Sequence, residues 1–182
     1  MGLTVENLTK RFGEKTAIHH LNFVMEEPGV FGLLGTNGAG KTTTIRSILG
    51  IMQPDEGKAL WNGKKITRDT LAFGYLPEER GIYMKAKVLE QLIYFGMLRG
   101  MKAEAKQSAQ ELMEQLQVTE YQNMQAEKLS KGNQQKIQLI AAIIHRPQLI
   151  FLDEPFSGLD PVNAVVLRNL VKKLVKEGKY II

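Results

Sequence analysis

Cysteine is missing from this chain of 182 residues, and tryptophan occurs once. The lack of cysteine excludes disulfide bonds, thiolate metal sites and cysteine nucleophiles, although it does not indicate a compartment. Long apolar runs are missing too, since a segment such as 148–152 has the length of a strand and a membrane helix needs about 20 apolar residues. The first residues contain no basic region followed by an apolar stretch, so we expect no signal peptide. The sequence therefore predicts a chain that does not enter a membrane by itself and reaches one only through a partner.

The charges show only a small excess of one sign. Lysine and arginine total 24 and aspartate and glutamate total 19, which gives a net charge of +5. Basic residues occur in pairs such as Lys64-Lys65 and Lys172-Lys173, and acidic residues are interleaved with them. A nucleic-acid-binding protein usually has a denser basic stripe with aromatic residues between the charges. We therefore expect a soluble globular chain with no nucleic-acid partner.

Hydrophobic periodicity predicts alternating strands and helices, as in an α/β protein. The expected strands are 3–6, 22–25, a strand 29–34 buried on both faces, strands and turns over 54–76, then 149–152 and a strand that begins at 180. The expected helices are 41–49, a helix from 88 that includes Val88, Leu89, Leu92, Ile93 and 95–97 on one face, then 103–116, 130–145 and 162–176. The length predicts a single domain over 1–182, with a helical subdomain at about 78–140 inserted into the α/β core.

A glycine-rich motif lies between the expected buried strand and the helix 41–49. It reads Gly35, Thr36, Asn37, Gly38, Ala39, Gly40, Lys41 and Thr42, and it matches the P-loop pattern G-x-x-x-x-G-K-[ST]. Glycines let the backbone wrap tightly, so that its N–H groups and the helix N-terminus attract phosphate. Lys41 would reach the β- and γ-phosphates, the Thr42 hydroxyl would bind Mg²⁺, and Thr43 continues the nucleotide-binding segment. The alternative, an ordinary glycine-rich turn, does not account for the flanking strand and helix.

Two adjacent carboxylates, Asp153 and Glu154, follow the apolar strand 149–152. The carboxyl end of a strand is where open α/β sheets bind ligands. Asp153 suits a role as a Mg²⁺ ligand, directly or through water. Glu154 would orient and polarise the attacking water, as a catalytic residue together with Lys41. The alternative is a solvated strand end that caps the next turn.

A third motif, Leu129-Ser130-Lys131-Gly132-Asn133, begins the expected helix 130–145, where Ser130 is also a natural N-cap. Together with the P-loop, the Asp-Glu pair and the downstream segment 157–160, which reads Ser-Gly-Leu-Asp, this order of motifs resembles the ABC ATPases. The signature of that family reads L-S-G-G-Q and its D-loop reads S-x-L-D. The resemblance covers essentially the whole chain and rests on four ordered motifs. It implies a P-loop NTPase core with an antiparallel β portion and an inserted helical subdomain.

The resemblance also implies partners and further site residues. In that family, two ATP-binding domains pair head to tail, and each ATP lies between one P-loop and the signature of the partner. By this analogy Ser130, Lys131, Gly132 and Asn133 would face the ATP that the other subunit holds. Phe12 lies where the family has an aromatic residue that stacks on adenine, with a core or turn phenylalanine as the alternative. Asp160 would lie at the dimer interface as the D-loop aspartate.

Three positions depart from the family pattern. Lys131 replaces the usual glycine and Asn133 the usual glutamine, and we hypothesise that Lys131 adds a positive charge near the γ-phosphate. Glu78 stands at the Q-loop position, where the family normally has glutamine. A carboxylate could still bind the metal there, although its charge would alter the site.

The resemblance predicts MgATP as the cofactor and a cytoplasmic location at the inner face of the membrane, through an integral membrane subunit. The segments 77–81 and 129–133 resemble ATPase subunits of bacterial ABC-2-type exporters, including sodium-extrusion pumps. The family's switch histidine lies beyond the strand that begins at Tyr180, and His19, His20 and His145 are not placed to replace it. We therefore expect a chain truncated before that histidine, which binds nucleotide and hydrolyses it poorly by itself. The alternatives are a soluble ABC-type ATPase that acts on ribosomes or DNA, and a P-loop kinase or switch protein, against which the signature argues.

Overall fold

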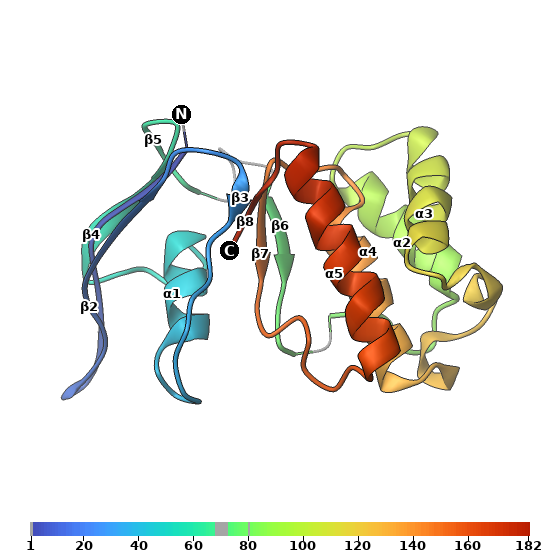
Figure 1. The fold of residues 1–182 in the computed structure, drawn as a ribbon, viewed down its shortest axis with the longest axis horizontal. Helices are drawn as coiled ribbons and strands as arrows, with labels where there is room; N and C mark the ends of the chain where they lie inside the picture. The colour runs from blue at the N-terminus through green and yellow to red at the C-terminus, as the bar shows by residue number, and fades with distance from the viewer. Residues whose placement is uncertain (1, 68–72, 80) are drawn as a thin grey trace. The chain divides into compact units, whose positions relative to one another are not determined.

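The computed structural model describes residues 2–67, 73–79 and 81–182, and the chain divides into two compact units. The β-rich unit comprises residues up to 73 together with 180–182, and the helical unit comprises 74–179. The strands are β1 (Leu3–Phe12), β2 (Lys15–Met25), β3 (Gly29–Val30), β4 (Glu56–Trp61), β5 (Lys64–Lys65), β6 (Phe73–Leu76), β7 (Leu149–Leu152) and β8 (Tyr180–Ile181). The helices are α1 (Lys41–Ile48), α2 (Val88–Leu98), α3 (Glu104–Gln115), α4 (Lys131–Ile143) and α5 (Pro161–Lys176), with short 3-10 helices η1 (Thr119–Tyr121) and η2 (Ala126–Lys128) (Figure 1).

An antiparallel sheet in the order β2-β1-β4-β5 forms most of the β-rich unit. β1 and β2 form a hairpin in which Phe12 pairs with Lys15, and Gly13 adopts a φ of 58° that suits a tight turn. Leu3, Val5 and Leu8 of β1 are fully buried, and α1 contacts both β1 and β2. These two strands are longer than the segments 3–6 and 22–25 that the sequence predicts, because irregular pairing between Val5 and Arg11 lets the ladder continue through polar residues.

The strand expected at 29–34 is much shorter than predicted. β3 contains two residues, which pair in parallel with β8, and the Phe31 N–H donates to the Ile181 carbonyl at 2.8 Å. Residues 32–34 have no strand structure, and 61% of Val30 and 95% of Leu34 are exposed. The prediction of a strand buried on both faces is therefore wrong. The apolar sequence indicated burial, but the short β8 gives this segment a ladder partner for only its first residues.

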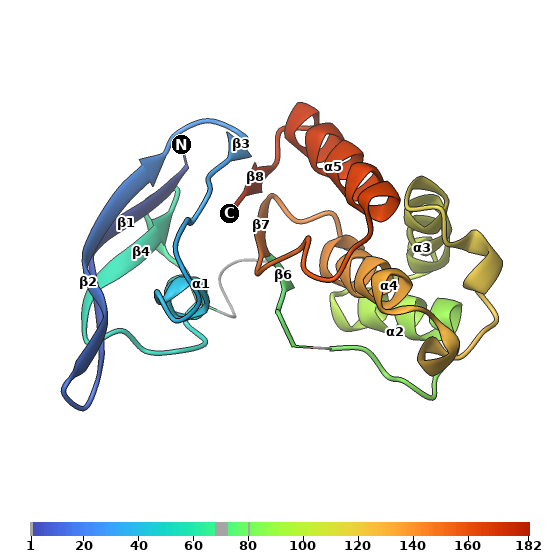
Figure 2. The same ribbon diagram turned by 60° about the horizontal axis from the view of Figure 1, so that its bottom comes forward.

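The helical unit packs α2, α3 and α4 against one another (Figure 2). α2 buries Val88, Leu92 and Gly96, whereas Met97, which the periodicity places on the same face, is 59% exposed. β7 is buried along its whole length and lies beside β6. The N-caps of α4 and α5 are Ser130 and Asp160, each of which accepts a backbone N–H with its side chain.

The combination of these strands and helices is the predicted α/β class. α2, α3 and most of α4 fall within 78–140, where we expect a helical subdomain, and that boundary stays a prediction. Arg80, part of the Q-loop segment 77–81, lies outside the described residues. Among the described residues, no helix is both long and apolar enough to cross a membrane.

Candidate nucleotide-binding site

The P-loop of the β-rich unit has the backbone that phosphate binding requires. Gly38 and Gly40 have φ angles of 82° and 90°, which residues with a side chain rarely adopt. A Cβ at Gly40 would lie 2.4 Å from the carbonyl oxygen of Ala17, so no other residue fits between this loop and β2. Residues 35–39 are exposed, and the Ala39 N–H donates to the Thr36 carbonyl at 3.1 Å. The loop is therefore tightly turned and open to solvent, as a cradle for a phosphate must be.

The amino end of α1 adds to this cradle. Its N-cap is Gly40, no side chain caps it, and its first turn contains no acidic residue. The N–H groups of this turn and the positive end of the helix favour an anion. The ammonium of Lys41 donates to the carbonyls of Gly35 and Thr36 at 3.0 and 3.1 Å, which places its charge over the same loop. Thr42 and Thr43 follow in the first turn and are half-buried, so the predicted P-loop residues lie together.

Phe12 lies at the end of β1 in the β1–β2 hairpin. Its side chain is 49% exposed, and the ammonium of Lys10 lies 5.7 Å from the centre of its ring. This position does not support the alternative of a core phenylalanine, because an exposed ring contributes little to a core. An exposed ring at the end of a strand is available for stacking, and stacking on adenine stays a prediction.

Asp153 directly follows β7 in the helical unit and is 2% exposed. Its N–H donates to the carbonyl of Leu76, the last residue of β6, at 2.9 Å, so the carboxyl ends of β6 and β7 meet here. Its Oδ2 is buried and has no hydrogen-bond partner among the described residues. A buried carboxylate oxygen without a partner is costly, and a cation would remove that cost.

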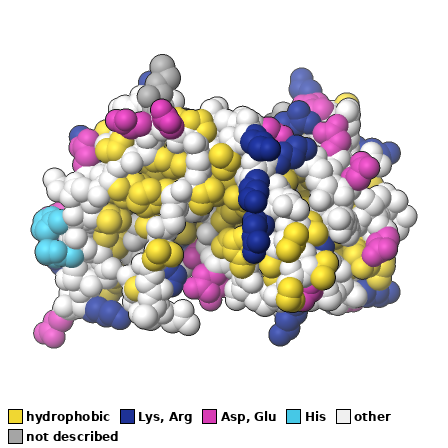
Figure 3. All heavy atoms as spheres, in the orientation of Figure 1, with side chains coloured by type: hydrophobic (Ala, Val, Ile, Leu, Met, Phe, Trp, Pro, Cys, Tyr) yellow, Lys and Arg dark blue, Asp and Glu magenta, His cyan; other side chains and the backbone are white. Residues whose placement is uncertain are grey.

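Mg²⁺ fits this donor set. Mg²⁺ is usually held by one or two carboxylates, water and the phosphates of the substrate rather than by an all-protein cage. Among the residues that the structure describes, no three His, Asp or Glu side chains form a metal cluster. His19 and His20 of β2 are exposed. Figure 3 shows histidine side chains, in cyan, at the surface of the β-rich unit. One buried aspartate is therefore a better candidate ligand than any histidine group.

Glu154 adopts a φ of 50°, in the left-handed region that few residues other than glycine occupy. Its carbonyl accepts the Ser157 N–H at 3.0 Å, which starts the turn toward the D-loop segment. Such backbone conformations cost about 1–3 kcal/mol and cluster at functional sites. The two adjacent carboxylates have different environments, since Asp153 is buried and Glu154 is half-buried.

Glu78, the predicted Q-loop residue, is exposed and follows β6 by two positions. The amide of Gln138, from α4, donates to the carbonyls of Pro77 at 3.1 Å and Glu79 at 2.7 Å, which lie on either side of Glu78. Gln138 is 5% exposed and was not among the predicted site residues. A sequence signal for it exists, because it is a polar residue among the buried apolar residues 137, 139 and 140 of α4.

The signature and the D-loop lie together. The Ser130 Oγ accepts the Asn133 N–H at 3.3 Å, so Ser130 acts as the N-cap of α4. Gly132 is buried, and a Cβ there would lie 3.3 Å from Asn163 Nδ2 and 3.4 Å from Leu159 Cδ2. Asn163 in turn donates its N–H to Asp160 Oδ1 at 2.9 Å and its side-chain amide to Oδ2. Asn163 therefore connects Gly132 to Asp160, a link that the sequence analysis did not predict.

The charges around this group are mixed. Lys131 is exposed and Asn133 is half-buried at the amino end of α4. Hydrogen bonds from Asn163 hold the pKa of the Asp160 carboxyl below its ordinary value. Burial lowers the pKa of Lys136, one turn further along α4, while the charges of Asp160 and Glu120 act in the opposite direction. A buried cation beside the D-loop aspartate is a second feature that the motifs did not indicate.

The predicted site residues thus divide between the two units. The β-rich unit carries the P-loop and Phe12, and the helical unit carries Glu78, the signature, Asp153, Glu154 and Asp160. Each set contains contacts that the predicted chemistry needs: a phosphate cradle in the first, and a buried carboxylate with an adjoining signature and D-loop in the second.

Known proteins are similar to this chain in sequence. The family model for ABC transporters matches residues 18–157. The ABC transporter ATP-binding protein YhaQ of Bacillus subtilis is 49% identical over 178 residues, which is 97% of this chain and 60% of YhaQ. The linearmycin resistance ATP-binding protein LnrL of Bacillus subtilis is 35% identical over 99% of this chain and 60% of LnrL. The lipopolysaccharide export system ATP-binding protein LptB of Haemophilus influenzae is 30% identical over 97% of this chain and 76% of LptB. The chain thus spans well under two thirds of the length of YhaQ and LnrL.

Solved structures share the fold. The structure of an ATP-binding subunit of an ABC transporter superposes with a TM-score of 0.87 at 29% identity, over 100% of this chain and 78% of that one. The ADP conformation of the ATP-binding cassette MJ1267 superposes with a TM-score of 0.82 at 25% identity, over 99% of this chain and 79% of that one. These structures confirm the predicted P-loop NTPase fold. The family match confirms the predicted resemblance to ABC ATPases. The chain belongs to the family of ABC transporter ATP-binding domains.

Proposed function

We propose that this chain binds MgATP and hydrolyses it within a head-to-tail pair of such domains, and that the cycle drives export by a separate membrane subunit. The observation that carries the proposal is the P-loop, with Gly38 and Gly40 at positive φ before an uncapped helix. The two relatives whose names state a role in export or resistance, LptB and LnrL, support the direction. The second domain, the membrane subunit and the cytoplasmic location at the membrane are parts of the same proposal.

Phosphate binding, metal binding and water activation are assigned to different residues in this proposal. The N–H groups at the start of α1 and the ammonium of Lys41 bind the phosphates, which need orientation and charge neutralisation more than covalent help. Asp153 is the proposed Mg²⁺ ligand of the helical unit, with Glu78 as a further candidate, and Thr42 is the proposed Mg²⁺ ligand of the P-loop. Bound Mg²⁺ neutralises charge on the terminal phosphates. Glu154 orients the attacking water and accepts its proton. Ser130 and Gly132 contact the nucleotide of the partner domain, and Phe12 stacks on adenine.

The hydrolytic step is tested by Glu154→Gln. The amide keeps the size of the side chain but cannot accept a proton, so we expect phosphate release to fall at least about 100-fold. The affinity for a fluorescent ATP analogue should stay within about twofold, and Lys41→Ala should lose that affinity. Phosphate release by Glu154→Gln at the wild-type rate would refute the assignment of Glu154. Unchanged binding by Lys41→Ala would refute the nucleotide site itself.

An exposed apolar group on the helical unit is the candidate contact for the membrane subunit. Tyr83 and Tyr94 are 55% and 47% exposed, and Met97 and Leu98 at the end of α2 are about 60% exposed. The ring of Tyr83 stacks on Phe95 with 5.6 Å between centres, so these aromatic residues form one group. Contiguous exposed apolar side chains of this kind are typical of protein interfaces.

A charged residue in this group should weaken docking. We expect Tyr94→Glu to lower the amount of the chain that co-sediments with membranes from cells expressing the membrane subunit, because an unpaired carboxylate would be buried at the contact. Glu90→Gln on the same helix is the control, since Glu90 forms an exposed ion pair with Lys87. Equal co-sedimentation of the Tyr94→Glu variant and wild type, with ATP affinity intact, would place the contact elsewhere.

A further inference from the structure

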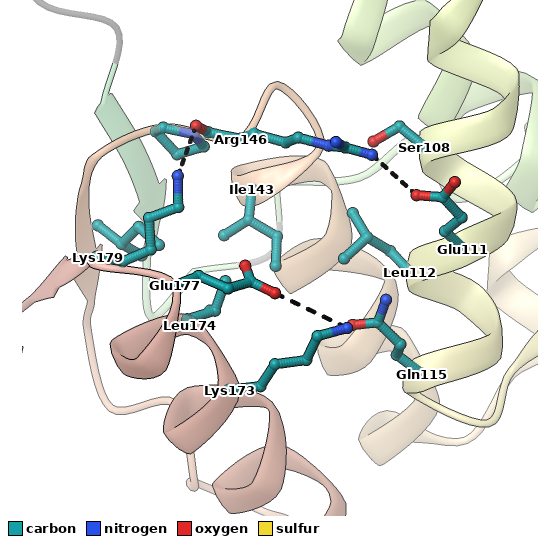
Figure 4. A pocket seen from close by; sticks show the side chains of 12 residues that line it. Ser108, Glu111, Leu112, Gln115, Ile143, Arg146, Lys173, Leu174, Glu177 and Lys179 are labelled. Atoms are coloured by element: carbon teal, nitrogen blue, oxygen red, sulfur yellow. Dashed lines mark hydrogen bonds and ion pairs between the residues drawn. The ribbon is translucent and has the colours of Figure 1, made fainter.

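A cavity of about 280 Å³ lies within the helical unit, away from the residues assigned to nucleotide chemistry. α3, the end of α4, β7 and the end of α5 line it (Figure 4). Ile150 of β7 lines it, and Asp153 follows three residues later, about 10 Å along the chain. The P-loop belongs to the other unit, and neither the signature nor the D-loop lines the cavity. The cavity therefore has no role in the proposed ATP cycle.

The floor of this cavity is apolar. Leu112 from α3 is half-buried and supplies accessible apolar surface, whereas Ile143, Ile150 and Leu174 line the cavity but are at most 7% exposed. Figure 4 shows Ile143 and Leu112 directed toward the same space. An open pocket of this volume, lined by both polar and apolar groups, approaches the size of small-ligand sites. The floor suits a hydrocarbon group.

The rim carries charge with a positive surplus. Arg146 pairs with Glu111 at 2.9 Å, and Lys173 pairs with Glu177 at 3.9 Å, the outer limit of an ion pair. Lys179 donates to the carbonyl of Arg146 at 3.1 Å and has no carboxylate partner among the described residues. Three cations and two carboxylates thus line the cavity. One positive charge stays unneutralised beside an apolar floor.

The backbone holds Arg146 at this rim. Its φ of 53° is left-handed, and its N–H donates to the Ile143 carbonyl at 2.8 Å at the end of α4. Helix ends in this conformation usually have glycine or asparagine. An arginine in this conformation has a strained backbone. Its carbonyl accepts a hydrogen bond from the Lys179 ammonium, and its guanidinium donates to Glu111.

We propose that this cavity binds a small organic carboxylate with an apolar tail, whose carboxylate pairs with Lys179 and whose tail lies against Leu112, close to Ile143 and Ile150. The site does not depend on the proposed function, and its test uses no nucleotide. Lys173 adds a second ammonium for the carboxylate, because its pair with Glu177 is long and exposed. The apolar tail replaces water over the floor, which supplies the affinity, and the positive surplus selects an anion.

Octanoate is the probe, and the readout is the NMR shift of isoleucine δ1 methyl groups in the full chain. We expect saturable shifts of the Ile143 and Ile150 methyls, while the methyl of Ile45 in α1 stays in place. Neutral 1-octanol should bind at least about tenfold more weakly, because it lacks the charge that Lys179 pairs with. The absence of a saturable shift at Ile143 and Ile150 would overturn the proposal, and so would equal affinity for 1-octanol.

Two variants test separately the charge of Lys179 and the open volume of the cavity. Lys179→Gln should weaken octanoate binding about tenfold or more, while its amide can still donate to the Arg146 carbonyl. Lys172→Gln is the matched control, an exposed lysine of α5 outside the cavity, and should bind like wild type. Leu112→Trp, at a half-buried position, should fill the cavity and abolish the methyl shifts. Wild-type affinity in Lys179→Gln, or wild-type shifts in a folded Leu112→Trp protein, would overturn the assignment.

Discussion

Asp160 caps α5 through its carboxylate, and the strength of this cap depends on the charge. Both of its oxygens accept hydrogen bonds from Asn163, which hold the pKa of the carboxyl below its ordinary value of 3.8. Because the folded-state pKa is the lower one, the stabilisation is fully present above the unfolded-state pKa. It is lost as the pH falls through the folded-state pKa. Acid should therefore weaken the start of α5, where Asn163 also adjoins Gly132.

A comparison of wild type with Asp160→Asn across pH measures this effect. We expect the difference in thermal unfolding temperature between the two proteins to be largest near about pH 6 and to shrink toward about pH 3. Asn163→Ala removes the side-chain donor to Asp160 Oδ2 and keeps the backbone N–H donor to Oδ1, so in that background the Asp160→Asn change should show a smaller pH dependence that does not vanish. A difference that stays constant from pH 6 to pH 3 in the wild-type background would contradict the prediction.

At the residue scale, the motifs predict the groups with distinctive chemistry, whose roles stay predictions, and they miss groups that position them. Gly40, Lys41 and Asp153 stand in motifs whose spacing follows from the chemistry, so one sequence was enough. Gln138 acts on the carbonyls of Pro77 and Glu79, some 60 residues away in the chain. Its partners are backbone atoms, which have no residue type to recognise. Such contacts become visible only when the fold brings the two segments together.

At the element scale, β6 packs so closely on α4 that one position admits only glycine. A Cβ at Gly74 would lie 2.6 Å from the Ala142 carbonyl oxygen and 3.0 Å from Pro147 Cγ. Gly74→Ala should therefore push the strand from the helix and lower the free energy of unfolding by about 1–3 kcal/mol. Urea unfolding followed by circular dichroism, which reports on the helices of this unit, measures the change.

Gly81 provides the matched control. A Cβ there would meet its nearest atoms, Gln138 Nε2 and Pro77 Cγ, at 3.8 and 3.9 Å, which is ordinary contact. Gly81→Ala should change the unfolding free energy by less than about 0.5 kcal/mol. If the two variants lost the same stability, close packing at Gly74 would not be the cause, and the argument for Gly74 would fail.

The starts of helices were predictable where a local signal marks them. α4 and α5 begin at the N-caps Ser130 and Asp160, and α1 begins directly after the P-loop glycine, so their predicted starts agree with the structure to within a residue or two. The segment 31–34 was predicted wrongly, because its apolar residues indicate burial without saying which strand would pair with it. The length of a ladder depends on its neighbour, and that neighbour, β8, lies some 150 residues away.

At the scale of the whole molecule, the chain places its phosphate cradle in one unit and its carboxylates and signature in the other. The order of motifs along the chain predicted the family, but it did not predict this division. The reason is that contact density, rather than motif order, decides which segments form a compact unit. The proposed phosphate-binding loop and the proposed catalytic Glu154 therefore belong to different units.

The single tryptophan allows the β-rich unit to be followed alone. Trp61 lies at the end of β4, and its ring contacts that of Tyr180 edge-on at 4.9 Å between centres, within the same unit as the P-loop. A ligand that binds only the folded state stabilises it by about 2.7 kcal/mol at 100 times its dissociation constant. Saturating MgATP should therefore raise the thermal midpoint of the Trp61 fluorescence transition by several degrees.

Two lysine variants decide whether this shift comes from the P-loop. Lys41→Ala removes the ammonium over the loop and should abolish the rise in the midpoint. Lys58→Ala removes an equal charge from an exposed ion pair with Glu6 and should keep the full rise, because surface pairs contribute little. A midpoint that MgATP leaves unchanged in wild type would contradict nucleotide binding by this unit. A rise that persists in Lys41→Ala would instead place the bound nucleotide away from the Gly35–Thr42 loop.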